Sequence, residues 1–179
     1  MLTAQTSGWK HASLSLANKL EKLIIASANL FCWSSALLIL VIIVNVVMRY
    51  GFNNGLILFE EIQWHLYAIG IMFGLSYAEI TNSQVRVDVI ASRLKPSTVI
   101  KWEIFGALFF ALPMVYVVAY NSIDYVATAY RLNESSVSPL GLPYRWLIKA
   151  VIPSSFIMLA LAVIARMIRN VIQLLETEN

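Results

Sequence analysis

Residues 23–48 read LIIASANLFCWSSALLILVIIVNVVM and contain no charged side chain between Lys22 and Arg49. An α-helix needs roughly 20 apolar residues to cross the hydrocarbon core of a bilayer. This stretch exceeds that length, whereas the apolar part of a cleavable signal peptide has only about 7–15 residues. Residues 1–22, which precede it, are polar overall. We therefore expect a transmembrane helix here, and we expect it to remain in the mature protein.

Three further stretches also lack charged residues: 62–78, 104–123 and 150–165. The middle one is long enough to cross a bilayer as it stands, and the other two become long enough if their helices begin earlier, near Leu56 and Trp146. Lys149 would then reach the interface with its ammonium group. The sequence predicts an all-α integral membrane protein with four transmembrane helices in a single membrane domain, residues 1–179, with spans at about 23–49, 57–79, 99–126 and 146–168.

The composition agrees with a membrane protein and argues against several other classes. Hydrophobic residues make up 59% of the chain and charged residues 13%, whereas soluble domains have about 45–50% apolar and about 25% charged residues. The net charge of +3 is too small and too dispersed to indicate a nucleic-acid partner. Cys32 is the single cysteine, so no disulfide can form within the chain.

The distribution of basic residues predicts the orientation. If the N-terminus is cytoplasmic, nine of the 13 Lys and Arg residues fall in inner segments, and four fall outside. Cytoplasmic segments of membrane proteins carry an excess of Lys and Arg. We therefore expect both the N- and C-termini to be cytoplasmic. The four outer residues are Arg49, Arg131, Arg145 and Lys149.

The segment before the first span, about residues 10–22, has an amphipathic pattern. Leu16, Leu20, Leu23 and Ile24 recur at helical spacing, with charged residues between them. One interpretation is an interfacial helix that lies on the inner membrane surface. The other is a plain cytoplasmic extension of the first span, and the sequence leaves both open.

The longest outer connector, about residues 129–145, contains SSVSPLGLP at 135–143. Its two prolines disfavour helix, so we predict an ordered loop on the outer face. Pro113 and Pro153 lie inside the third and fourth spans, and we expect each to bend its helix.

Three charged residues gather at the outer end of the hairpin made by the first two spans: Arg49, Glu60 and Glu61. Isolated charges near hydrocarbon are costly, so we predict an ion pair between Arg49 and either glutamate. A cation site or a proton relay is the functional alternative. Glu61 and His65 share a helical face, but no further Cys or His is placed to complete the three or four protein ligands that zinc needs.

Gly70 and Gly74 form a GxxxG pattern in the second span, and Ala78 extends the row of small residues. Small residues let membrane helices approach closely. We predict a packing seam, either within the chain or towards a partner.

Aromatic residues cluster near the outer end of the third span, where Tyr116, Tyr120 and Tyr125 lie close to Asp124. We interpret the tyrosines as interfacial belt residues, with a contact from Asp124 to Arg131 or to a partner as the alternative. The sequence contains no Gly-x-Ser-x-Gly, P-loop or HExxH motif. We therefore predict no enzyme activity, no metal and no cofactor.

Four patches resemble the small membrane subunit, called DctQ-like, of tripartite ATP-independent periplasmic (TRAP) transporters. The resemblance covers about residues 20–170. Residues 86–88, Arg-Val-Asp, match the end of the family's Gly-His-x-Arg-Val-Asp motif, although Ser83 and Gln84 replace its Gly-His. The other patches are NVVMRY at 45–50, EEIQW at 60–64 followed by the two glycines, and residues 143–153 at the entry to the last span.

The resemblance implies an accessory role in a sodium-coupled transporter that imports organic acids across the bacterial inner membrane. In such systems a periplasmic substrate-binding protein captures the substrate, and a large polytopic membrane subunit moves it as an elevator. The small subunit would be a scaffold among membrane lipids and would help dock the binding protein. The residues expected at partner interfaces are Arg49, Glu60, Glu61, Trp64, Gly70, Gly74, Arg86 and Asp88, and those expected to dock the binding protein are Ser136, Ser138, Pro139 and Pro143.

Two other functions remain open from the residues alone. The chain could be a self-sufficient homo-oligomeric channel or carrier with a pore built from Glu60, Glu61 and Asp124. It could also be a membrane anchor or redox subunit that uses Glu61 and His65. The first predicts transport by the purified chain, and the second predicts a bound metal or haem.

Overall fold

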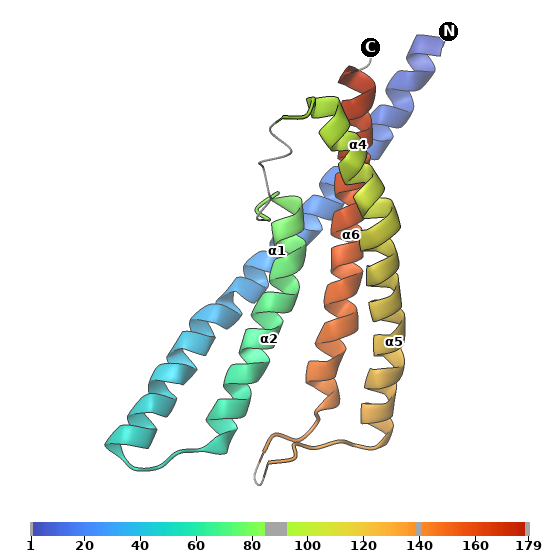
Figure 1. Cartoon of the computed structure of the whole chain (residues 1–179). Coiled ribbons are helices and arrows are strands. Elements are labelled where there is room, and N and C mark those ends of the chain that lie inside the picture. Colours follow the sequence, from blue (N-terminus) through green and yellow to red (C-terminus); the bar gives the residue numbers. More distant parts are fainter. Residues whose placement is uncertain (1, 85–92, 139–140, 178–179) are drawn as a thin grey trace.

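The computed structural model describes residues 2–84, 93–138 and 141–177 of the chain, and these residues contain helices and no strand (Figure 1). The long apolar stretches form helices because a helix satisfies every backbone polar group within its own segment, as a bilayer requires. The elements in chain order are α1 (Leu2–Gly51), α2 (Ile57–Ile80), α4 (Pro96–Gly106), the π-helical segment η1 (Ala107–Ala111), α5 (Leu112–Arg131) and α6 (Trp146–Thr177).

The helices form an antiparallel bundle (Figure 1). α1 and α2 make one hairpin, and the rod formed by α4, η1 and α5 makes a second hairpin with α6. α6 contacts α1, α2, α4 and α5, so it is the helix that joins the two hairpins. Both chain ends lie at the same end of the bundle, called the inner end below, and the two helix-connecting loops at the opposite end define the outer end.

Among the described residues, three helices are long and apolar enough to cross a membrane: Ala12–Gly51, Pro96–Arg131 and Trp146–Thr177. The structure thus supports three of the four predicted spans by length and composition. α2 has 24 residues, about 36 Å at 1.5 Å per residue, which is long enough. Its apolar character is interrupted at both ends, by Glu60, Glu61 and His65 and by Glu79, so the fourth span stays a prediction.

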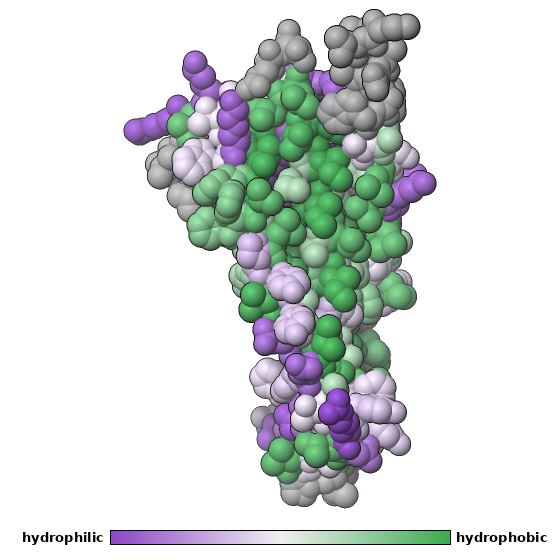
Figure 2. Space-filling view, turned by 90° about the vertical axis from the view of Figure 1, so that its right-hand side faces the viewer, coloured by the Kyte–Doolittle hydropathy of each residue, from purple (hydrophilic) through white to green (hydrophobic). Residues whose placement is uncertain are grey.

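The surface of the bundle is apolar between its two ends. Figure 2 shows a hydrophobic band over the face that includes α5, with hydrophilic residues gathered towards both ends. Large apolar side chains such as Trp33, Leu40 and Phe110 are exposed. In a membrane-spanning protein these side chains face lipid or another membrane protein rather than water.

The N-terminal segment is continuous with the first span. α1 runs from Leu2 to Gly51 without interruption, which agrees with the helical-extension alternative rather than a separate interfacial helix. Ala17 and Ile24 are fully buried in this part of α1. Arg169 of α6 forms an ion pair with Glu21 and donates a hydrogen bond to Asn18 Oδ1 at 2.8 Å. The extension therefore packs on the C-terminal part of α6.

The two in-span prolines have different local effects. η1 ends two residues before Pro113, so the helix adopts wider π turns directly before the residue that lacks an N–H donor. α6 instead stays α-helical through Pro153. The hydroxyl groups of Ser154 and Ser155 donate to backbone oxygens in the preceding turn, including Ala150 O at 2.8 Å and Ile152 O at 2.9 Å.

Candidate functional site

The outer end contains the predicted ion pair, and Glu60 is the partner. Arg49 Nη1 lies 3.7 Å from Glu60 Oε1, and the two side chains are 60% and 49% exposed. Exposed pairs of this kind contribute about 0–1 kcal/mol. This contact joins the ends of α1 and α2, but its energetic contribution is small.

Glu61 points elsewhere and holds the outer loop. Its carboxylate accepts a hydrogen bond from the hydroxyl of Ser136 and another, at 2.6 Å, from the backbone N–H of Leu142. The loop closes on itself, since Ser136 N–H donates to Leu142 O at 3.1 Å. A Cβ on Gly141 would lie 2.4 Å from Ser136 Cβ and 2.7 Å from Glu61 Oε1. Only glycine lets the loop approach this carboxylate so closely.

The predicted docking residues fall on this loop. Ser138 N–H donates to Ser136 Oγ at 3.2 Å, and Ser138 O accepts from Gly141 N–H at 3.0 Å. Pro143 is exposed shortly before α6 begins, and Pro139 lies outside the described residues. The described part of the loop is thus ordered by its own hydrogen bonds, as the prolines predicted.

His65 bonds to its own helix, and the neighbouring Trp64 is exposed. His65 Nδ1 lies 2.6 Å from the backbone oxygen of Glu61, so this nitrogen carries the proton that it donates along the helix. The described residues contain no group of three His, Cys, Asp or Glu side chains that would hold a metal ion. Trp64 is 71% exposed on the outside of α2.

Lys149 marks a second contact beneath the outer loop, one that the sequence did not predict. Its ammonium forms an ion pair with Glu134 and lies 3.9 Å from the centre of the Tyr125 ring. The sequence predicted an ammonium that reaches the interface, but Lys149 is buried and its charge is neutralised within the protein. Tyr125 is accordingly more than a belt residue, because its ring faces this cation.

The two glycines of the predicted packing seam, Gly70 and Gly74, have different surroundings. A Cβ on Gly70 would lie 3.1 Å from Ser34 Oγ and 3.4 Å from Ser35 Oγ, so Gly70 allows α2 to approach α1. A Cβ on Gly74 would meet nothing within 4 Å. Gly74 lines an open groove of about 280 Å³ between α1 and α2, together with Ala28, Asn29, Phe31, Cys32, Ser35, Gly70 and Tyr77.

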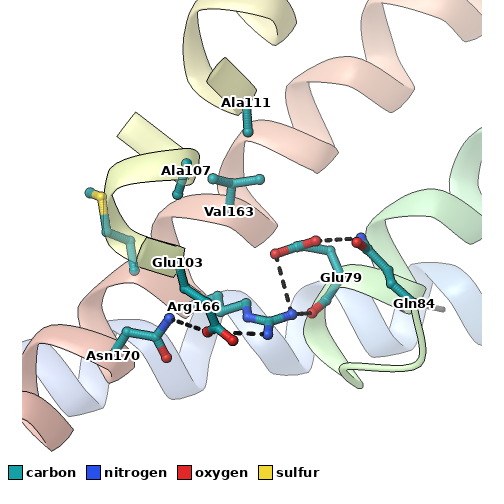
Figure 3. A pocket seen from close by; sticks show the side chains of 10 residues that line it. Glu79, Gln84, Glu103, Ala107, Ala111, Val163, Arg166 and Asn170 are labelled. Atoms are coloured by element: carbon teal, nitrogen blue, oxygen red, sulfur yellow. Dashed lines mark hydrogen bonds and ion pairs between the residues drawn. The ribbon is translucent and has the colours of Figure 1, made fainter. Parts of the chain in front are cut away.

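The inner end contains a polar cluster centred on Arg166 of α6 (Figure 3). Its guanidinium donates to the backbone oxygen of Glu79 at 3.0 Å and to Asn82 Oδ1 at 2.7 Å. It also lies 3.5 Å from a carboxylate oxygen of Glu79 and of Glu103. Asn170 donates to the same Glu103 carboxylate at 2.9 Å. One arginine thus joins α6 to the end of α2 and to α4.

Sequence reasoning named neither Arg166 nor Arg169 as a site residue. The available signal was their spacing, because Arg166, Arg169 and Asn170 follow the last uncharged stretch at intervals that place them within one helical turn. Their partners come from residues far away in the chain, which spacing does not reveal. Arg86 and Asp88, which the sequence did single out, lie outside the described residues.

These features define a class, a multi-pass helical membrane protein in which several charged side chains bind one another between different parts of the chain. A family model described as "Tripartite ATP-independent periplasmic transporters, DctQ component" matches residues 38–173. The chain belongs to this family, the small-permease component of TRAP transporters, which confirms the resemblance seen in the sequence.

A curated relative supports the assignment. It is a protein of Haemophilus influenzae (strain ATCC 51907 / DSM 11121 / KW20 / Rd) whose provisional name is TRAP transporter small permease protein. It is 31% identical over 112 residues, which cover 60% of this chain and 65% of the relative. The aligned region therefore spans less than two thirds of the relative's length.

Proposed function

We propose that this chain is the accessory and scaffold subunit of a sodium-coupled, binding-protein-dependent transporter that imports organic acids across the bacterial inner membrane. Its partners are a large polytopic membrane subunit, a periplasmic substrate-binding protein and membrane lipids. Membership of the DctQ family supports this role. The scaffold role rests on one observation, which is where the charged side chains find their partners. Glu60, Glu61, Glu134 and Arg166 bind other parts of the same chain rather than converging on a ligand.

The large subunit has a suitable place to pack in this proposal. Small residues make up most of the lining of the groove between α1 and α2, beside Phe31 and Tyr77, and Gly74 leaves the groove open. Membrane helices associate by close packing at small residues and by hydrogen bonds between polar side chains. Asn29 supplies such a polar group in the groove. A helix of the large subunit is the occupant that we propose for it.

The single membrane domain has four spans in this proposal, with both termini cytoplasmic. The common position of the chain ends supports it (Figure 1). α2 tolerates its polar residues because α1 and α6 pack beside it, and because Glu61 and Glu79 have partners within the chain.

The remaining predicted residues fit the same role. Arg49 and Trp64 are exposed near the outer end of the α1–α2 hairpin, and the Arg86–Asp88 motif of the family lies in the inner connector. We propose that they contact the large subunit. Ser136, Ser138, Pro139 and Pro143 belong to the outer loop that we propose as a docking element for the binding protein.

The test is a pull-down of tagged chain from its native membranes in mild detergent, followed by mass spectrometry. We expect a larger polytopic membrane protein in stoichiometric amount. Recovery of the chain alone or as its own oligomer would contradict the scaffold role. Transport by that isolated chain after reconstitution would then establish the channel or carrier alternative.

A further inference from the structure

The outer loop and the helix ends at its base present aromatic, apolar and basic side chains together. Val137 is 88% exposed, the highest value among the large apolar residues that the structure describes. We call the following set the outer-loop surface: Tyr130, Arg131, Leu132, Val137, Tyr144 and Arg145, all of which are exposed.

This surface is preformed. Glu61 holds the loop from below through Ser136 and Leu142. At the base of the loop, Arg145 N–H donates to Glu134 O at 3.0 Å, and the rings of Tyr130 and Trp146 meet edge to face with centres 5.4 Å apart. A surface that is already ordered loses little conformational entropy when a partner binds.

Arg131 and Arg145 are basic groups without a carboxylate partner among the described residues. The nearby acids are engaged elsewhere, since Glu134 pairs with Lys149 and Glu61 accepts hydrogen bonds from the loop. Glu60 pairs with Arg49. Asp124 lies seven residues before Arg131 on α5, about 10 Å along the helix axis. Both guanidinium groups are therefore available to a second molecule.

We propose that the outer-loop surface docks a soluble protein. The matching patch on that protein has acidic side chains around an apolar contact. This inference rests on the proposed function, in which that protein is the periplasmic binding protein. Tyr and Arg are, together with Trp, enriched among the residues that dominate binding energy at protein interfaces. Complementary charges at the rim would steer the encounter and fix the orientation of docking. Val137 supplies the apolar contact on the loop.

The experiment uses the chain in complex with its large subunit, in nanodiscs of phosphatidylcholine, titrated with the transporter's own purified binding protein. The test variant combines Arg131→Gln and Arg145→Gln. The matched control combines Arg93→Gln and Lys95→Gln, two exposed basic residues next to α4 at the inner end. We expect the test variant to weaken binding by about tenfold or more and to flatten its salt dependence, while the control leaves both unchanged.

A second variant separates the apolar contribution from the charge. Val137→Ser should weaken binding and leave the salt dependence as it is, because no charge changes. The conservative pair Arg131→Lys with Arg145→Lys should retain most of the salt dependence, because both positive charges remain. That result would exclude misfolding as the cause of weaker binding in the Gln variant.

Two outcomes would overturn the inference. One is unchanged affinity when the test variant still assembles with the large subunit. The other is a test variant that binds the binding protein as the wild type does but no longer binds vesicles that contain phosphatidylglycerol. That result would show that the two arginines bind lipid. Failure of the wild-type chain to assemble with a large subunit would instead refute the proposed function itself.

Discussion

At the residue scale, Arg166 makes the contacts that join the helices at the inner end. Its guanidinium reaches two helices besides its own, and its side chain and that of Glu79 are each 16% exposed. Removing one partner of a largely buried charge cluster leaves the others without compensation. The exposed Arg49–Glu60 pair offers a matched comparison, because the same chemistry there is surrounded by solvent or headgroups.

We therefore predict that Arg166→Gln destabilises the detergent-solubilised protein by about 3 kcal/mol. Arg49→Gln should cost about 1 kcal/mol or less. The measurement is the thermal unfolding midpoint of each purified variant, followed by tryptophan fluorescence. Equal midpoints for the two variants would show that the cluster around Arg166 does not hold the helices together.

At the element scale, α2 carries two glycines with different surroundings. Gly70 faces Ser34 and Ser35 of α1 at close range, whereas Gly74 faces the open groove. A larger side chain at the first position would push two helices of the same chain apart. The same side chain at the second position has room in this chain and would meet only what packs into the groove.

We predict that Gly70→Ile lowers the stability and yield of the isolated chain. Gly74→Ile should leave both near the wild-type values but reduce recovery of the large subunit in the pull-down, by about tenfold if the clash costs about 1.4 kcal/mol. Chromatographic profiles and recovered stoichiometry provide the two measurements. Full recovery of the large subunit with Gly74→Ile would exclude the groove as its packing site.

At the scale of the whole molecule, the number of spans decides on which sides the termini lie. Three spanning helices would place the two ends of the chain on opposite sides of the membrane, whereas four place them on the same side. By composition alone α2 is not among the helices apolar enough to cross a membrane, because of its polar residues. Its position beside α1 and α6, antiparallel to α1 and parallel to α6, favours four spans (Figure 1).

We predict that a reporter which fluoresces only in the cytoplasm is active at either terminus. A periplasmic phosphatase reporter should be active when inserted after Asn53 in the outer turn between α1 and α2, and inactive at both ends. Activity of the phosphatase reporter at the C-terminus would contradict the four-span arrangement.

The sequence by itself determined the helices of this protein and its family. The lack of charge over residues 23–48, 104–123 and 150–165 marks three helices, because the cost of charge in hydrocarbon leaves a pattern in the sequence. It also predicted an ion pair between Arg49 and either Glu60 or Glu61, since residues on both sides of a short turn are neighbours, and the structure selects Glu60. Only the tertiary structure decided the long-range partners. Glu61 binds a loop beyond residue 130, and Arg166 joins α2 to α4, because such contacts depend on how helices pack and not on their spacing along the chain.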